Sequence, residues 1–116
     1  MARLHHVNLG VPPDGDASEG EFLLAVGYRK VEVSEEMSGL GTRWYEADDG
    51  TQVHLSVDPD HRPAARAHTA IEVGDELDAV AERLRGAEIK FREGEIGGRR
   101  VLLCRDPAGN RWELRG

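Results

Sequence analysis

Four side chains of metal-binding types occupy matched positions in the two halves of this chain: His6, His54, His68 and Glu113. His68 follows His6 by 62 residues, and Glu113 follows His54 by 59 residues. Imidazoles and carboxylates are common ligands of transition metals in proteins. The spacing therefore predicts one ligand set that a duplicated fold gathers around a pseudo-twofold axis.

The sequence around these residues is itself repeated. The matching segments are 6–11 (HVNLGV) with 68–73 (HTAIEV), and 50–55 (GTQVHL) with 109–114 (GNRWEL). Half of a 116-residue chain would bury too little surface to be stable alone. We therefore expect one domain, 1–116, in which a first module (1–58) packs against a second module (67–116).

Hydrophobic periodicity and turn residues predict the order β-α-β-β-β in each module. In the first module the expected elements are a strand at 3–11, a helix from a Ser18–Glu21 capping box to Gly27, a strand at 28–34, and a hairpin of strands 42–47 and 52–57 after a loop at 38–41. In the second they are a strand at 67–73, a helix capped by Asp75 and stopped by Gly86, and strands near 88–93, 99–105 and 111–115. The polar segment 58–63 is the expected linker. This order indicates an α+β fold with two tandem βαβββ modules, whose curved mixed sheet carries helices on one face and surrounds a pocket with the other.

Alternation within the strands predicts which side chains face that pocket. In three of the four strands the candidate ligand has clear core residues beside it, so the ligands should point away from the helices. By the same parity the other pocket-facing residues are Asn8, Thr42, Trp44, Glu46, Gln52, Ser56, Val101, Leu103 and Arg111. We expect His5 to face the opposite side, His61 to be solvated in the linker, and Cys104 to be a buried, inert thiol.

Composition excludes several classes of partner. The formal net charge is −7, with 22 acidic residues against 15 basic ones, which disfavours binding to nucleic acid or to an anionic membrane. No apolar run approaches the length of a membrane span, and the first residues, MARLHH, do not resemble a signal peptide. A single cysteine fits a reducing compartment. We expect a soluble cytoplasmic protein.

Three segments carry a resemblance to a known family. They are 4–11 (LHHVNLGV), 62–70 (RPAARAHTA) and 106–114 (DPAGNRWEL). On these segments the chain resembles the vicinal oxygen chelate superfamily, which includes glyoxalase I, extradiol dioxygenases, fosfomycin-resistance proteins and bleomycin-resistance proteins. The resemblance covers nearly the whole chain. It implies that His6 and His54 of the first module and His68 and Glu113 of the second hold a divalent metal, in a site that a homodimer shares between its subunits.

A nitrogen-rich set of this kind suits Zn, Fe, Ni, Co or Mn better than Mg or Ca. Glu113 and His54 are the candidate catalytic residues, and the sequence leaves open whether His54 is a ligand or an acid/base group. Glyoxalase-like isomerisation in the family usually uses a second carboxylate where this chain has His54, and Glu46 is the nearby substitute. Lyase, isomerase and dioxygenase reactions all stay open.

The leading hypothesis is a metal-dependent enzyme of the glyoxalase/dioxygenase type that acts on a small substrate with adjacent oxygens. The alternative is a bleomycin-resistance-like protein that sequesters a drug-like molecule in the dimer groove. Such binders generally lack the ligand residues, so the full set favours the enzyme. A fosfomycin-type site is disfavoured because Val101, Leu103 and Glu93 stand where those proteins place polar and cationic groups.

Overall fold

The computed structural model describes residues 1–116, and its strands form two four-stranded sheets, one in each half of the chain. The first sheet has the order β1-β4-β3-β2 and the second the order β5-β8-β7-β6. The strands of the first sheet are β1 (His6–Val11), β2 (Arg29–Val31), β3 (Thr42–Glu46) and β4 (Gln52–Val57). Those of the second are β5 (His68–Glu72), β6 (Phe91–Ile96), β7 (Arg99–Arg105) and β8 (Arg111–Arg115). In both sheets the first and last strands of the module pair in parallel.

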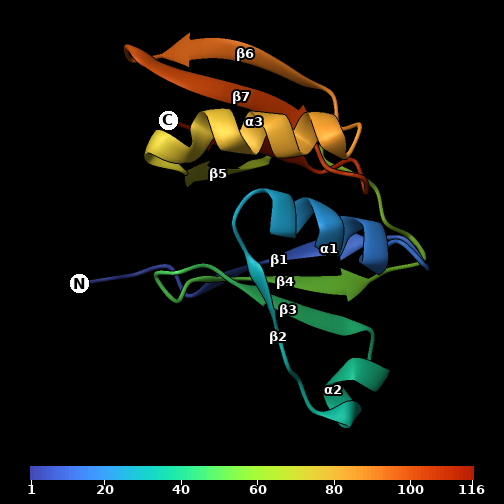
Figure 1. Ribbon diagram of the computed structural model, residues 1–116. Helices are drawn as coiled ribbons and strands as arrows, with labels where there is room; N and C mark the ends of the chain where they lie inside the picture. The colour runs from blue at the N-terminus through green and yellow to red at the C-terminus, as the bar shows by residue number, and fades with distance from the viewer.

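Two longer helices hold equivalent places in the modules, α1 (Asp16–Ala25) after β1 and α3 (Leu77–Gly86) after β5. Figure 1 shows α1 and α3 next to each other in the middle of the molecule, with β6 and β7 above them and β3 and β2 below. The α+β class with two tandem βαβββ modules is confirmed, and each module forms a sheet of its own. None of the helices combines the length and apolar character that a membrane span requires.

The helix starts differ from the sequence-based prediction. The expected capping box does not form, because α1 already begins at Asp16 with Gly15 as its N-cap, and the Ser18 hydroxyl donates to the Gly15 carbonyl instead. Asp75 does not cap α3. It lies inside a short 3₁₀ helix, η1 (Gly74–Glu76), that leads directly into α3 without a side-chain cap.

A short helix, α2 (Glu35–Gly39), occupies half of the segment between β2 and β3, which was expected to be a strand end and a loop. Ser34 caps it, since its Oγ accepts a hydrogen bond from Met37 N at 3.2 Å. Two glutamates in the first turn also favour a helix there through the helix dipole. The sequence therefore contained the local signals for α2, although the helix has only five residues.

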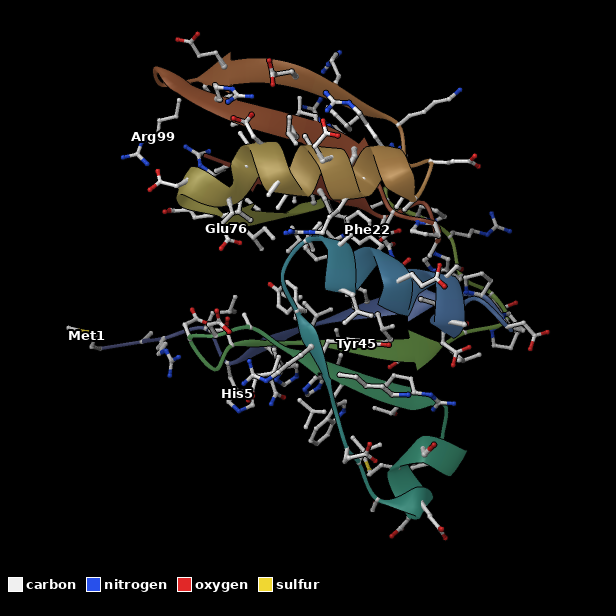
Figure 2. The ribbon with its side chains drawn as sticks, in the orientation of Figure 1. Met1, His5, Phe22, Tyr45, Glu76 and Arg99 are labelled. Carbon is white, nitrogen blue, oxygen red and sulfur yellow. The ribbon has the colours of Figure 1, made fainter.

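The two modules share one hydrophobic core of 17 buried residues. At its centre Phe22 of α1 packs against Trp112 of β8, with ring centroids 5.2 Å apart, and both side chains are almost completely buried. Figure 2 shows Phe22 on the side of α1 that faces the second module. Large aromatic rings supply much of the apolar area that drives such packing. Arg83 of α3 adds a hydrogen bond from Nε to the Ala25 carbonyl at 2.7 Å.

The loop 106–110, between β7 and β8, ties the second module to the first. Ala108 N donates to Glu19 Oε1 at 3.1 Å, and Asn110 Nδ2 donates to the Gly10 carbonyl at 3.0 Å. Both bonds cross from one module to the other. They fix the angle between the modules, and so the directions in which the two sheets face.

His61 is also part of this junction. Its Nε2 lies 2.9 Å from the Ala108 carbonyl, and its ring packs so closely on Gly10 that a Cβ there would come within 2.8 Å of His61 Nδ1. The expectation that His61 is solvated is therefore wrong. The linker folds back onto the loop 106–110, which sequence periodicity does not reveal.

Candidate metal centre and its surroundings

The register of the first sheet brings three aromatic rings together on one face. Asn8 of β1 and Trp44 of β3 are both paired with His54 of β4, and His6 begins β1 two residues earlier. The His6 and His54 rings stack with centroids 4.0 Å apart, and the His54 and Trp44 rings stack at 4.4 Å. The neighbours of His54, Val53 and Leu55, belong to the core. His6 and His54 thus share the face away from the core, as strand alternation predicts.

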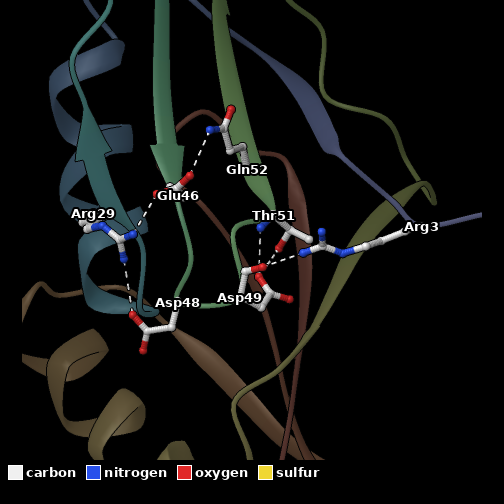
Figure 3. Close-up of polar contacts among 7 residues, drawn as sticks. All are labelled: Arg3, Arg29, Glu46, Asp48, Asp49, Thr51 and Gln52. Atoms are coloured by element: carbon white, nitrogen blue, oxygen red, sulfur yellow. Dashed lines mark hydrogen bonds and ion pairs between the residues drawn. The ribbon is translucent and has the colours of Figure 1, made fainter.

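A hydrogen-bonded chain fixes the orientation of His54. Its Nε2 lies 2.7 Å from Gln52 Oε1, Gln52 Nε2 donates to Glu46 Oε1 at 3.2 Å, and Glu46 Oε2 accepts from Arg29 at 2.7 Å. Figure 3 shows the hydrogen bonds that connect Arg29 to Glu46 and Glu46 to Gln52, next to a separate group formed by Arg3, Asp49 and Thr51. Because a carboxylate can only accept, it sets the Gln52 amide so that its oxygen receives a hydrogen bond from His54 Nε2–H. The lone pair of the neutral ring then lies on Nδ1.

Burial keeps His54 neutral. Only 9% of its surface is exposed. Desolvation lowers the pKa of His54 below its usual value, and the nearby His6 and His5 lower it further. A neutral imidazole is the form that binds a metal or accepts a proton. His54 is therefore suited to either of the roles that the sequence left open.

His5 lies beside His6 and not on the opposite side, which corrects the sequence-based expectation. It precedes β1, and its Nδ1 is 2.8 Å from His6 Nδ1. Figure 2 shows His5 at the end of the first sheet from which the N-terminal segment leaves. The contact occupies Nδ1 of His6 and leaves Nε2 as the atom available to a metal.

In the second module His68 and Glu113 form the equivalent pair. His68 Nε2 lies 4.0 Å from Glu113 Oε1, and Glu113 Oε2 accepts from Arg115 at 2.7 Å. His68 Nδ1 lies 3.0 Å from the Arg66 carbonyl, which can only accept, so the neutral ring carries its hydrogen on Nδ1. The lone pair of the neutral His68 ring then lies on Nε2, the ring nitrogen on the side of Glu113. A histidine oriented by a backbone carbonyl is a common arrangement among metal ligands.

The chain brings the four candidate ligands together as two pairs and not as one set. His6 and His54 lie on the first sheet, and His68 and Glu113 on the second. Within the chain no group of three or more His, Cys, Asp or Glu side chains is arranged to hold a metal ion. A single shared site stays a prediction, and it requires a second copy of the chain.

A cavity of about 860 Å³ opens beside the His68–Glu113 pair. Of the predicted pocket residues, Leu103 and Arg111 line it, whereas Val101 on the same face is fully buried and does not. Asn8, Thr42 and Trp44 lie on the first sheet, where the Asn8 Oδ1 accepts from Ser56 Oγ at 2.9 Å. They do not line this cavity.

Several lining residues were missed by sequence reasoning. Lys90, Arg92 and Arg105 border the cavity together with Arg111. Arg105 lies two residues after Leu103 in β7 and so on the same face, and Arg92 pairs with Leu103, so the same strand parity that identified Leu103 also applies to them. Their charge made them look like ordinary solvent-exposed residues.

Cys104 has the environment that the sequence predicts. It lies in β7 with 9% of its surface exposed, and burial raises the pKa of its thiol to about 12. Thiolate, the reactive form, is therefore suppressed at neutral pH.

Known proteins share the fold of this chain. The family model described as Glyoxalase/Bleomycin resistance protein/Dioxygenase superfamily matches residues 3–114. A search among curated protein sequences gave no significant match.

Several solved structures share the fold over nearly the whole chain. A protein of Bacillus anthracis assigned to the glyoxalase family has 23% sequence identity and a TM-score of 0.85, over 99% of this chain and 94% of that one. A glyoxalase/dioxygenase of Nostoc punctiforme has 22% identity and a TM-score of 0.77, over 97% and 89%. A mutant of the fosfomycin resistance protein FosX of Listeria monocytogenes, complexed with Mn(II) and 1S,2S-dihydroxypropylphosphonic acid, has 17% identity and a TM-score of 0.78, over 99% and 90%. With a family model that covers residues 3–114, the chain belongs to the Glyoxalase/Bleomycin resistance protein/Dioxygenase superfamily.

Proposed function

We propose that this protein is a metal-dependent enzyme whose site forms between two copies of the chain. In each site His6 and His54 of one subunit would face the partner subunit's His68 and the partner subunit's Glu113. The observation that carries the proposal is the placement of the two pairs. They hold equivalent register positions in the two modules, on faces away from the shared core, and neither pair alone is sufficient for a metal.

The donor atoms of the second pair suit a transition metal. Metal bonds to imidazole nitrogen and to carboxylate oxygen are about 2.0–2.2 Å long. Two atoms bound to the same ion are therefore about 3 to 3.8 Å apart at coordination angles of 90–120°. His68 Nε2 and Glu113 Oε1 are 4.0 Å apart, so a small approach of the two side chains would bring both within bonding distance of one ion. We propose Zn, Fe, Ni, Co or Mn as the metal, and the Mn(II) in the FosX complex supports a divalent ion in this fold.

The first pair gives its two histidines different roles. His6 Nε2 has no hydrogen-bond partner within the chain and is the natural third ligand. His54 is buried, stacked between two rings and held by Gln52, so only its Nδ1 is available. We therefore assign the metal to His6, His68 and Glu113, and His54 either completes the set or accepts a proton from substrate at Nδ1.

The substrate would be a small molecule with two adjacent oxygens. A bound divalent metal supplies Lewis-acid stabilisation to the negative charge that develops on such oxygens. The chain contributes the stacked Trp44–His54 surface, which can pack against a flat or apolar group, and the neutral His54 that can take up the proton. This combination supports a lyase, isomerase or dioxygenase reaction.

Complementation between subunits tests the shared site. One variant carries His6→Ala and His54→Ala, and the other carries His68→Ala and Glu113→Gln. Each alone should lose Mn(II) binding as measured by electron paramagnetic resonance. After co-refolding of equal amounts, mixed dimers would contain one intact site, so about one quarter of the wild-type binding should return. Glu95→Gln is a matched control, because Glu95 is an exposed carboxylate of β6 without an ion pair.

Two results would contradict the proposal. Wild-type protein that binds no divalent metal but binds flat aromatic compounds would identify a sequestering protein of the bleomycin-resistance type. Metal binding by a monomer, measured by sedimentation at the same protein concentration, would exclude the site between subunits.

A further inference from the structure

We propose that the cavity of the second module binds an oxyanion of the substrate, a carboxylate or a phosphoryl group, through Lys90, Arg92, Arg105 and Arg111. The inference rests on the proposed function for its place beside His68 and Glu113. It names a class of substrate, one that carries negative charge in addition to its metal-binding oxygens. Because the cationic residues belong to the chain itself, anion binding can be measured without metal.

Strand register concentrates positive charge in one row of the second sheet. His68 of β5 is paired with Arg111 of β8, and Arg111 is paired with Arg105 of β7. Arg92 of β6, paired with Leu103, lies in the next row on the same face. Like charges directly opposite each other on neighbouring strands destabilise a sheet. A bound anion would remove that repulsion.

None of the four cations forms an ion pair, although the chain contains more acids than bases. The salt bridges of the chain involve other basic residues, and Lys90, Arg92, Arg105 and Arg111 are absent from them. Of the acids at the cavity, Glu113 is paired with Arg115, and the two oxygens of Asp106 accept from Asn110 N and Trp112 Nε1. Glu88 is the one remaining lining carboxylate.

The first module provides an internal comparison, because the same fold carries no such row there. Its equivalent row runs from His6 to Gln52 to Glu46, and Glu46 is paired with Arg29 at 2.7 Å. Charge is therefore balanced in this row of the first module and unbalanced in the corresponding row of the second. The cationic cavity is a property of this module's residues and not of the βαβββ unit.

The two arginines of the row are already held in place. Arg105 Nη1 donates to the Gly109 carbonyl at 2.7 Å, and Arg111 Nη1 donates to the Ala65 carbonyl at 2.9 Å. All hydrogen bonds that these guanidinium groups make within the chain use Nη1, so their Nη2 and Nε donors have no partner. A guanidinium anchored at one nitrogen loses less conformational freedom when its other donors bind an oxyanion.

The experiment titrates metal-free, full-length protein with inorganic phosphate, with malonate, and with malonamide as the uncharged counterpart of malonate. Binding is followed by the amide shifts of β7 and β8 in nuclear magnetic resonance spectra. The test variant is Lys90→Gln/Arg92→Gln, since neither side chain makes a hydrogen bond or ion pair and the fold should tolerate both changes. The control is Lys30→Gln/Arg99→Gln, which removes the same charge outside this cavity.

We expect malonate or phosphate to bind and malonamide not to bind. The dissociation constant should rise about tenfold in Lys90→Gln/Arg92→Gln, a loss of about 1.4 kcal/mol, and less than about twofold in the control. Tighter phosphate binding would assign a phosphoryl group, and tighter malonate binding a carboxylate. Equal binding of malonamide, or equal weakening in the two variants, would overturn the inference.

A parallel Mn(II) titration separates this inference from the proposed function. If wild-type protein binds Mn(II) but not the anions, the anion site is wrong and the metal site stands. If it binds the anions at the cavity but not Mn(II), the metal site is wrong and the anion site stands.

Discussion

Gln52 and His54 lie two residues apart on β4, and Gln52 Oε1 is 2.7 Å from His54 Nε2. Their side chains share one face of the strand, so this contact is a direct product of strand geometry. It assigns the hydrogen of the neutral ring to Nε2 and leaves Nδ1 for chemistry. The fixed tautomer is the property of the first module that a mutation can test most directly.

Replacement of Gln52 by Met should release that tautomer. Without its acceptor, the buried Nε2–H costs about 1–3 kcal/mol or the hydrogen moves to Nδ1. Nitrogen-15 shifts of the imidazole at pH 8 should report one tautomer in the wild type and a mixture in Gln52→Met.

The control is Ser56→Ala. Ser56 lies on β4 like Gln52, and the change removes a hydrogen bond to Asn8 of β1 but leaves the contacts of His54 untouched. An unchanged spectrum in Gln52→Met would show that Gln52 does not orient the ring.

Gly20 should resist replacement although it lies inside a helix. Alanine in a helix interior normally stabilises by about 0.5–1 kcal/mol relative to glycine. In α1, however, a Cβ on residue 20 would lie 2.1 Å from the Tyr45 hydroxyl oxygen. Gly20→Ala should therefore lower the free energy of unfolding by about 1–3 kcal/mol in urea denaturation.

Tyr45→Phe tests the cause of that loss, because it removes the oxygen that the new Cβ would meet. Gly20→Ala should cost much less in a Tyr45→Phe background than in the wild type. Equal costs in the two backgrounds would place the strain elsewhere.

The Cys104 thiol should be protected from reagents in the folded protein. Its pKa of about 12 and its burial both oppose thiolate formation. Labelling with Ellman's reagent at pH 8 should be slow and should accelerate in urea in parallel with unfolding. Fast labelling without denaturant would mean that β7 opens locally.

Strand parity in the sequence was enough to predict these local features. Cys104 alternates with Leu103, and His54 alternates with Val53, so their faces follow from a period of two. The order of the strands and of the two longer helices, and the equivalence of His6 with His68, could also be predicted from periodicity and the repeat. Each of these features depends only on neighbours along one strand or on the repeat.

Features that depend on how the modules dock could not be predicted in this way. Nothing next to Glu19 in the sequence shows that it is buried, and a glutamate in the first turn of a helix is usually exposed. Its burial results from contact with Ala108, which is 89 residues away. The separation of the candidate ligands into two pairs has the same origin, since the relative placement of His6 and His68 is set by that docking.

The buried carboxyl group of Glu19 should make the protein less stable as pH rises. Glu19 is fully buried beside Asp106, and its Oε2 has no partner if the group is ionised. Burial, with a smaller contribution from Asp106, raises the pKa of Glu19 from 4.5 to about 10. In the neutral form Oε2 can donate to the Asp106 carboxylate, while Oε1 still accepts from Ala108 N.

The sign of the effect follows from proton linkage. Below pH 4.5 both the folded and the unfolded chain carry the proton on Glu19, so burial has no charge cost. Between pH 4.5 and about 10 the unfolded chain releases the proton and the folded chain keeps it. The free energy of unfolding should then fall by up to about 1.4 kcal/mol per pH unit.

Glu19→Gln should remove this dependence, because the amide can donate to Asp106 and accept from Ala108 N without a titrating proton. Urea denaturation at pH 7 and pH 9 should show a steep loss of stability for the wild type and a shallow one for Glu19→Gln, which should be the more stable protein at pH 9 by at least ~2 kcal/mol. His54 contributes little in this window, because it is mostly neutral in both the folded and the unfolded chain. Cys104 adds a small loss of stability near pH 9, where the thiol of the unfolded chain begins to ionise, but wild type and Glu19→Gln share it, so the difference between them reports Glu19. The exposed Glu21, on the same helix, supplies the control Glu21→Gln, which should retain the wild-type slope. Equal slopes in wild type and Glu19→Gln would mean that Glu19 is ionised at the junction, and its Oε2 beside Asp106 would then need a donor that the contacts of the chain do not provide.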